Sequence, residues 1–485
     1  MTTAREDDAL HLDETALRQR LEALASFPAL DRASVERFGD ALRALGAWDR
    51  LRMNPYRFAA AHGLPEAEAV ELFVHGAKVG LFDFVWNHIC PSCGALIGSH
   101  DSVNSLTALA HCATCDVDVE ANLDDQIEVA FALNPAIATS RIDPYGDEEA
   151  YFRYFFSPNF VCSERIAAAM EAAQRGVAML APDDEAELAF ETREGDVHRI
   201  VSVERNLTAT FETGGAGDAA VVEVSLLETG LHPARSVVAP GRVTVRIRNL
   251  CKTHAGAILF YDDEEIERLF AQDEPEMLPF LTGKQLLNSQ SFRDLFRVQR
   301  LVPGLQLPLR SLTILFTDLK GSTELYDLTG DAYAYALVQE HYVRLAEAVR
   351  ENSGAVIKTM GDAIMASFSR PIDAVRAAAG MIERIDALNE AWGERGHSLG
   401  LKVGLHEGPA LAVNADDRLD YFGQTVNIAA RVQGLAQAGE IWHTTQVGDA
   451  DGVRDFLRFR GFDESTHQVS LKGVGQPVRV HQWKS

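Results

Sequence analysis

The chain has 485 residues, of which 47% are hydrophobic and 24% are charged, as in ordinary soluble globular proteins. Because this length exceeds what a single core supports, we expect two to four domains. The formal net charge of −26 argues against nonspecific binding to nucleic acids or anionic membranes. No apolar run reaches the ~20 residues of a membrane helix, the acidic N-terminus does not resemble a signal peptide, and the six cysteines do not make a secreted disulfide framework. We therefore expect a soluble cytoplasmic protein.

Residues 1–85 predict a helical, winged-helix-like domain. Ala, Leu and Glu recur at helical spacing, and breaks that contain proline divide the stretch into short helices. A DNA-recognition helix over residues 66–79 would turn Glu66, Glu68 and Glu71 toward phosphates, which is the wrong sign of charge. We therefore interpret these helices as a packing module that does not contact DNA.

Four cysteines form two Cys-x-x-Cys pairs with eighteen residues between them: Cys90, Cys93, Cys112 and Cys115. This spacing predicts a zinc ribbon over residues 86–120. Four thiolates complete a tetrahedral Zn²⁺ and leave no open coordination position, so the ion should be structural. Since residues 86–125 contain no Lys or Arg, we expect the ribbon to be a scaffold and not a contact to nucleic acid.

Three further segments precede the C-terminal domain. Residues 121–183 predict a connecting helical region whose last helix runs from Ser163 to Met179. Short, alternating β-branched runs over residues 184–265 predict a small antiparallel β-sandwich. Residues 266–308 predict a helical linker. This linker could transmit a signal or act as a passive spacer, and its sequence favours neither.

Residues 309–485 predict an α+β sheet covered by helices on one face. Asp318 and Asp362 each follow an apolar, strand-like run. At neighbouring strand ends, two such carboxylates can share a pair of Mg²⁺ ions, which bind through one or two carboxylates plus substrate phosphates. A helix expected over residues 322–329 begins soon after Asp318, and free N–H groups at a helix start favour a triphosphate. The residues at this start are therefore substrate-binding candidates: Gly321, Ser322 and Thr323.

Five further residues follow in the order of a known family: Lys358, Asp420, Asn427, Arg431 and Lys472. Lys358 precedes Asp362 by four positions. Asn427 and Arg431 lie at i and i+4, on one face of an expected helix. Together with the two aspartates, these residues make the C-terminal domain similar to the catalytic domain of class III nucleotide cyclases. The resemblance implies a ferredoxin-like α+β fold within a multidomain α+β protein.

The resemblance also implies a two-metal mechanism. Asp318, Asp362 and the Leu319 carbonyl would hold two Mg²⁺ or Mn²⁺ ions. One ion would activate the ribose 3′ oxygen for in-line attack on the α-phosphorus, and the other would hold the leaving pyrophosphate. In family members the metal ligands and the nucleotide-contacting residues of one site come from different subunits. Because this chain carries both sets, we expect a head-to-tail homodimer with two interfacial sites and an inactive monomer.

The same resemblance assigns the nucleotide contacts. Lys472 would bind the phosphate tail, Asn427 would orient the ribose, and Arg431 would meet the negative charge that develops at the α-phosphate. Lys358 can only donate hydrogen bonds and ionised Asp420 can only accept them, which matches the N1 and N6 positions of adenine. Guanine reverses both edges, so ATP is the preferred substrate.

We therefore expect an adenylyl cyclase that converts ATP to 3′,5′-cyclic AMP and pyrophosphate and is regulated by a ligand or protein at its N-terminal region. That region resembles the uncharacterised segment ahead of cyclase domains in some bacterial proteins. Three alternatives stay open: a guanylyl cyclase, a nucleotide-binding protein without turnover, and a zinc-ribbon transcription factor with a vestigial cyclase. The intact Asp, Asn and Arg set disfavours the second, and the acidic ribbon disfavours the third.

Overall fold

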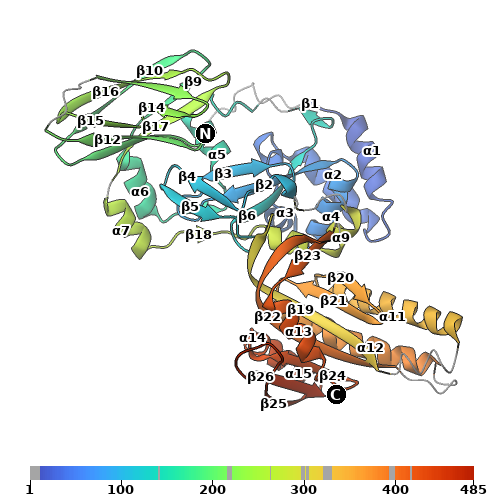
Figure 1. Ribbon diagram of the computed structural model, residues 1–485. Helices are drawn as coiled ribbons and strands as arrows, with labels where there is room; N and C mark the ends of the chain where they lie inside the picture. The colour runs from blue at the N-terminus through green and yellow to red at the C-terminus, as the bar shows by residue number, and fades with distance from the viewer. Residues whose placement is uncertain are drawn as a thin grey trace.

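The computed structural model describes residues 11–139, 142–215, 221–262, 264–296, 301, 305–320, 330–392, 399–415 and 418–484. In Figure 1 these residues form a β-sandwich, a neighbouring part made of helices and short strands, and a C-terminal domain built on one large sheet. None of the described helices is long and apolar enough to cross a membrane.

Helices at the N-terminus form because polar residues cap them and apolar faces join them. The described ones are α1 (Glu14–Leu24), α2 (Arg32–Ala44), α3 (Pro55–His62) and α4 (Glu66–Lys78). The side chains of Asp13, Asp31 and Asn54 accept backbone N–H groups at the first three helix starts. Buried Phe38 and Phe73 pack edge to face at a centroid distance of 5.1 Å and hold α2 against α4.

The next part is a small sheet with a separate hairpin. Its antiparallel strand order is β3 (Leu96–His100), β2 (Phe82–Ile89) and β6 (Ile127–Leu133). The hairpin pairs β4 (Leu109–Cys112) with β5 (Val117–Glu120). Shorter elements complete this part: β1 (His11–Leu12), η2 (Trp48–Arg50), η3 (Val103–Ser105), β7 (Ala138–Thr139), α5 (Glu148–Phe155), β8 (Phe160–Val161) and β18 (Glu276–Met277).

The helix predicted from Ser163 to Met179 is wrong in its second half. Helix α6 spans Glu164–Ala173, and the chain continues directly as strand β9 (Gln174–Leu180). This strand pairs with β17 (Ala255–Tyr261) at the edge of the sandwich. Long-range backbone pairing therefore overrides the local helical preference of the segment, as tertiary context often does.

The predicted β-sandwich is present, with two sheets over a common core. One sheet has the order β10 (Glu185–Thr192), β16 (Gly241–Asn249), β13 (Val221–Leu227) and β14 (Gly230–His232). The other has the order β15 (Arg235–Val238), β12 (Leu207–Thr213), β11 (Val197–Ser202), β17 and β9. We expected the sandwich to be entirely antiparallel, and this is wrong for two strand pairs: β12 runs parallel to β15, and β13 runs parallel to β16. A reading of local alternation detects strands but not which strands become neighbours.

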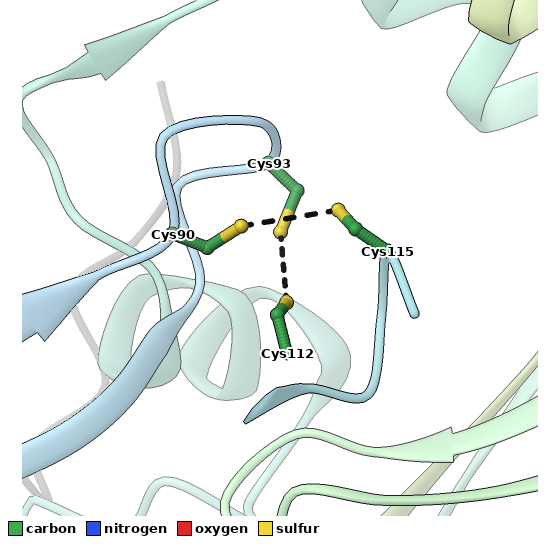
Figure 2. Close-up of side chains that lie close together, drawn as sticks. All are labelled: Cys90, Cys93, Cys112 and Cys115. Atoms are coloured by element: carbon green, nitrogen blue, oxygen red, sulfur yellow. Dashed lines mark hydrogen bonds between the residues drawn. The ribbon is translucent and has the colours of Figure 1, made fainter. Parts of the chain in front are cut away.

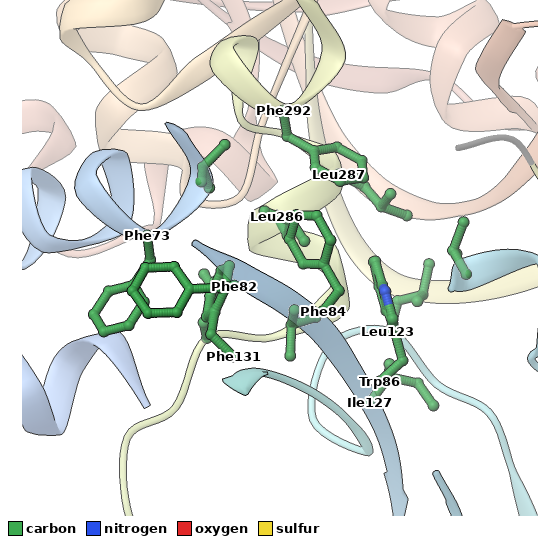
Figure 3. Packing of buried hydrophobic residues seen from close by; sticks show 14 of the residues in the cluster. Phe73, Phe82, Phe84, Trp86, Leu123, Ile127, Phe131, Leu286, Leu287 and Phe292 are labelled. Atoms are coloured by element: carbon green, nitrogen blue, oxygen red, sulfur yellow. The ribbon is translucent and has the colours of Figure 1, made fainter. Parts of the chain in front are cut away.

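The segment before the C-terminal domain contains α7 (Glu264–Gln272), α8 (Gly283–Leu287) and α9 (Gln290–Leu295). Leu286, Leu287 and Phe292 are at most 1% exposed. Figure 3 shows them beside Phe84 and Trp86 of β2, in the core that β2 shares with the N-terminal helices. The α8–α9 segment is therefore a buried element between two parts of the molecule and not an exposed linker.

The described C-terminal sheet has the strand order β20, β21, β19, β22, β24, β26 and β25, with β23 paired to β22. The strands are β19 (Leu307–Lys320), β20 (Gly354–Met360), β21 (Ala363–Phe368), β22 (Gly400–Ala415), β23 (Arg418–Phe422), β24 (Glu440–Thr444), β25 (Asp463–Val469) and β26 (Val478–Lys484). The helices are α11 (Asp331–Glu351), α12 (Pro371–Trp392), α13 (Gln424–Gln433), α14 (Thr445–Gly448) and α15 (Val453–Phe459). The helix predicted over residues 322–329 lies outside the described residues.

Helices cover both faces of this sheet, so the expectation of helices on one face is wrong. Leu315 and Leu405 point to the face under α11 and α12, where they join one apolar core. Helix α13 packs on the opposite face, against β22. It can approach so closely because Gly404 has no side chain: a Cβ there would lie 2.1 Å from the backbone nitrogen of Gln433. This glycine could not be interpreted without knowing which helix lies above it.

Candidate functional site

Asp318 and Asp362 lie at the same end of the C-terminal sheet. Asp318 is near the end of β19, and Asp362 occupies the turn between β20 and β21 with Gly361, whose φ is +65°. Thr317 Oγ accepts the backbone N–H of Ile364 at 3.1 Å, which ties this turn to β19. The structure therefore brings the two predicted metal ligands to adjacent strand ends, where a shared cation site requires them.

Lys402 is a member of this site that the sequence analysis missed. Its Nζ lies 2.6 Å from Oδ2 of Asp318, across the β19–β22 pair in which the two residues are directly opposite. Leu401 and Val403 point into the core under α11 and α12, so Lys402 points to the other face. The only signal in the sequence was a single lysine between apolar residues of the strand β22, which indicates a charged group on the face opposite the core. Leu319, whose carbonyl is the third predicted ligand, has its side chain buried in that same core.

Lys358 and Asp420, predicted to recognise the base, form an ion pair. The Nζ of Lys358 lies 2.6 Å from Oδ2 of Asp420, and the two side chains are 40% and 18% exposed. The other carboxylate oxygen of Asp420 accepts the N–H of Tyr421 at 2.7 Å. The two residues come from β20 and β23 and are 62 positions apart in the sequence. The structure therefore assembles a donor and an acceptor side by side, partly open to solvent.

Asn427 and Arg431 project from α13, and Arg431 reaches the turn that contains Lys472. A Cβ at Gly473 would lie 3.4 Å from the guanidinium of Arg431, so this glycine leaves room for the arginine. Asn427 and Lys472 are exposed, and Arg431 is partly buried. Within the part of the chain that the structure describes, these three side chains make no hydrogen bond or ion pair. They are therefore available to a ligand.

The predicted residues, together with Lys402, thus form three groups in one chain. The first is Asp318, Asp362 and Lys402, the second is the Lys358–Asp420 pair, and the third is Asn427, Arg431 and Lys472. Among the described residues, no hydrogen bond or ion pair connects one group to another. The remaining candidates, Gly321, Ser322 and Thr323, lie outside the described residues.

The Lys358–Asp420 pair is supported by half-buried Arg293 and by buried Tyr421 and Asn288, which sequence reasoning also missed. Arg293 of α9 donates through Nη1 to the Leu419 carbonyl at 2.9 Å and lies 5.4 Å from the ring centroid of Tyr421. Burial raises the pKa of Tyr421, so its hydroxyl stays protonated and donates to Oδ1 of Asn288 at 3.1 Å. These contacts hold both neighbours of Asp420 in β23. No pattern within the helical segment signals contacts to residues about 130 positions away.

A second candidate site is the four-cysteine cluster. Cys90 and Cys93 follow β2, and Cys112 and Cys115 lie at the β4–β5 turn. Figure 2 shows the four sulfur atoms pointing toward one another, and all lie within 4.8 Å of each other. The Cys90–Cys115 and Cys93–Cys112 sulfur pairs are 3.9 and 3.7 Å apart. A tetrahedral Zn²⁺ with bonds of about 2.3 Å requires sulfur separations of about 3.8 Å. The cluster fits that ion.

Comparison with known protein families divides the chain at the same place as the fold. Residues 22–294, more than half of the chain, match a family described as a family of unknown function, DUF5939. Residues 307–478 match the family described as the adenylate and guanylate cyclase catalytic domain. The chain belongs to the DUF5939 family and ends in a class III nucleotide cyclase domain. All the predicted nucleotide and magnesium-site residues lie in the cyclase domain, and the four cysteines lie in the DUF5939 region.

Curated relatives match the cyclase domain only in part of their own length. An adenylate cyclase of Lachancea kluyveri is 31% identical over 164 residues, which cover 30% of this chain and 9% of the relative. An uncharacterised protein of Mycobacterium tuberculosis is 33% identical over 168 residues, which cover 34% of this chain and 39% of the relative. The chain thus spans less than half the length of these curated relatives.

Solved structures with similarity to the chain include cyclases named for either base. The adenylyl cyclase CyaB from P. aeruginosa is 24% identical, with a TM-score of 0.33, and the match covers 37% of this chain and 96% of that one. The guanylyl cyclase Cya2 is also 24% identical, with a TM-score of 0.32, and the match covers 38% of this chain and 94% of that one.

Proposed function

We propose that the protein is an adenylyl cyclase that converts ATP to 3′,5′-cyclic AMP and pyrophosphate in a homodimer. The observation that carries this proposal is the ion pair of Lys358 with Asp420 in a cyclase domain whose carboxylates share one sheet end. A lysine donor beside a carboxylate acceptor complements N1 and N6 of adenine. In the same pose guanine would place its N1–H donor at Lys358 and its O6 acceptor at Asp420, so the pair favours ATP over GTP.

The carboxylate group fits the divalent cations that cyclases of this class require. Asp318, Asp362 and the Leu319 carbonyl offer hard oxygen donors, which suit Mg²⁺ or Mn²⁺. Asp318 already attracts a cationic group, the ammonium of Lys402 at 2.6 Å. When bound, such ions favour deprotonation of the ribose 3′ hydroxyl and neutralise charge on the phosphates. We assign these three residues to the two-ion site.

The third group binds and orients the triphosphate. Arg431 and Lys472 carry positive charge and make no ion pair among the described residues. Arg431 lies beside Gly473, the residue that follows Lys472. Arg431 stabilises the charge that develops at the α-phosphate, Lys472 binds the phosphate tail, and Asn427 orients the ribose from the same face of α13. We also assign phosphate contacts to Gly321, Ser322 and Thr323, which follow the end of β19 in sequence.

A head-to-tail homodimer would complete each site. Within one chain the carboxylate group makes no hydrogen bond or ion pair with the other two groups among the described residues, which is consistent with sites shared between two chains. Met360 and Phe422 are 41% and 70% exposed. They lie next to the Asp362 turn and to Asp420, where a second copy could cover them. We therefore place the interface at this end of the cyclase domain.

Substrate choice can be tested with the purified full-length chain, Mn²⁺ and either ATP or GTP. We expect cyclic AMP as the main product, identified by its mass. Cyclic GMP as the main product would overturn the assignment of Lys358 and Asp420 to adenine. Absence of both products from a folded dimer would support the alternative of a nucleotide-binding protein without turnover.

Subunit mixing tests the shared site. Chains with Asp318→Ala and chains with Arg431→Ala should each be inactive because each homodimer lacks one required group in both sites. Mixed dimers should regain one intact site. If exchange of subunits is demonstrated by a mass label and activity does not return, the two groups act within one chain and the shared-site geometry is wrong.

We also propose that the four cysteines hold one structural Zn²⁺. We place the protein in the cytoplasm, where thiols stay reduced. We further propose that the DUF5939 region regulates the cyclase domain. All six cysteines of the chain are free thiols in the structure. Elemental analysis of the purified chain should find about one zinc per chain. Cys93→Ser should lose this zinc, whereas Cys162→Ser, outside the cluster, should retain it. Equal zinc contents in both variants would contradict the assignment.

A further inference from the structure

Helix α9 (Gln290–Leu295) lies between the DUF5939 core and the cyclase domain and contacts both. Toward the DUF5939 region, Ser291 Oγ donates to Glu71 at 2.7 Å, and Lys78 donates to the Leu295 carbonyl at 2.8 Å. Phe292 is 1% exposed and meets the ring of Phe84 edge to face at 5.7 Å. One side of this helix is therefore anchored in the core of the N-terminal part, as Figure 3 shows for Phe292.

The other side of α9 contacts the two strands that carry the Lys358–Asp420 pair. Gln290 Oε1 accepts the backbone N–H of Val356 at 2.7 Å, two residues before Lys358. The β20–β21 register shifts between Val356 and Lys358, so this hydrogen bond holds the irregular part of the strand. Strand β20 is also the edge of the sheet, so its outward N–H groups depend on partners outside the sheet.

Arg293 holds the second strand one residue away from Asp420. It donates to the carbonyl of Leu419 at 2.9 Å, donates to the carbonyl of Leu287 at 2.8 Å, and lies over the ring of Tyr421. Three contacts fix the guanidinium between α8 and β23. A side chain at a sheet edge and a side chain on another strand can form a 2.6 Å pair only if both strands keep their relative position. Gln290 holds β20 and Arg293 holds β23, and the two residues are three positions apart on one short helix.

We propose that Gln290 and Arg293 are positioning residues that set the Lys358–Asp420 pair and thereby the selectivity for the purine base. This inference rests on the proposed cyclase function and deepens it. A shift of α9 moves the donor and the acceptor relative to each other and changes how well adenine fits between them.

The test compares kcat and KM for ATP and for GTP in full-length Gln290→Ala and Arg293→Met chains. We expect KM for ATP to rise roughly fivefold to tenfold, the effect of about one lost hydrogen bond, with a smaller change in kcat. The ratio of kcat/KM for ATP to that for GTP should fall by a similar factor. Arg293→Lys retains a donor and a positive charge, so it should restore part of the ratio.

Ser291→Ala is the matched control, because it removes a hydrogen bond from the same helix on the side that faces Glu71. Buried Phe292 and the Lys78–Leu295 hydrogen bond still anchor that side, so the helix should keep its position. It should leave the ATP-to-GTP ratio unchanged. A purely structural role for Gln290 and Arg293 would reduce the active fraction, which lowers kcat for both nucleotides equally and leaves both KM values unchanged. That outcome, in chains whose circular dichroism and dimer content match the parent, would refute the proposal.

Failure of the proposed function gives a different result. If the parent chain converts neither ATP nor GTP, calorimetric titration with each nucleotide and Mg²⁺ replaces the kinetic assay. Gln290→Ala and Arg293→Met should then weaken ATP binding relative to GTP binding by the same roughly fivefold to tenfold factor. Unchanged relative affinities would refute the positioning role even though no turnover is measured.

Discussion

The two faces of the cyclase sheet differ in what they bury. The face under α11 and α12 is closed by apolar side chains, and Leu315, Phe368 and Leu405 are completely buried there. The opposite face carries Asp318 and Lys402, and its apolar residues continue into the core of the DUF5939 region. A closed apolar face contributes stability, whereas charged groups need a face that ligands can reach. The sheet therefore separates the residues that hold the fold from those that serve the site.

The largest effect should come from the charged face. Asp318→Asn keeps the shape of the side chain but removes the negative charge that a divalent cation needs. We expect cyclic AMP formation to fall by a factor on the order of 10³, as when a central electrostatic contact is removed from an active site. Asp455→Asn, an exposed carboxylate on α15, is the control and should retain full activity. Near-normal turnover of Asp318→Asn, measured by product mass, would exclude Asp318 from the ion site.

Truncation of apolar residues should distinguish the two faces by the form of unfolding. Leu405→Ala on the closed face should lower the free energy of unfolding by about 2–5 kcal/mol. Phe292→Ala, in the core shared with the DUF5939 region, should cost about 3–5 kcal/mol and also separate the unfolding of the two regions. Calorimetry should then show one lowered transition for the first variant and two transitions for the second. A single transition in both would mean that Phe292 does not couple the regions.

Buried His341 should make stability depend on pH. It lies on α11, is 0% exposed, and burial lowers its pKa to about 4. The unfolded chain, with a pKa near 6.5, binds a proton that the folded chain excludes, so stability is full above pH 6.5 and falls as pH drops toward 4. From this group alone we expect a loss of about 2 kcal/mol between pH 6.5 and 5. Urea unfolding of His341→Gln should show a weaker pH dependence than the parent.

The exposed His467 provides the control for this dependence. His467→Gln changes a side chain at the surface and uncovers no buried group, so it should keep the parent slope of unfolding free energy against pH. If His341→Gln and His467→Gln show the same slope, protonation of His341 does not oppose folding, and the pH dependence has another source among the buried histidines.

The smallest effect should come from Lys402. Its ammonium competes with divalent cations for Asp318, and the side chains of this pair are 23% and 35% exposed. For so open a pair the interaction amounts to about 1 kcal/mol or less. Lys402→Gln should therefore lower the Mn²⁺ concentration for half-maximal activity by roughly fivefold or less. If Lys402→Gln instead needs a higher Mn²⁺ concentration than the parent for half-maximal activity, Lys402 helps to build the ion site and does not compete for it.

Motifs with strict spacing could be interpreted before the fold was known. The Cys-x-x-Cys pairs predicted a compact sulfur cluster, because each pair forms a local turn and four thiolates favour one metal. The order of Asp318, Asp362, Asn427 and Arg431 likewise indicated the cyclase domain, which the family comparison confirms. Local periodicity also predicted most strands of the sandwich, since alternation along a half-buried strand is a property of the chain itself.

Three features depended on long-range contacts and could not be predicted. Strand β9 forms because β17 is available as a neighbour, and Lys402 becomes part of the site only because β22 lies beside β19 in that register. The role of α9 depends on Phe292 entering one core while Arg293 reaches β23 in another domain. The sequence by itself determined which metal-binding and nucleotide-binding side chains are present, because residue types and their local spacing are properties of the sequence. Tertiary structure alone decided which groups meet and which face of each element is open, because such contacts join residues that are far apart in the chain.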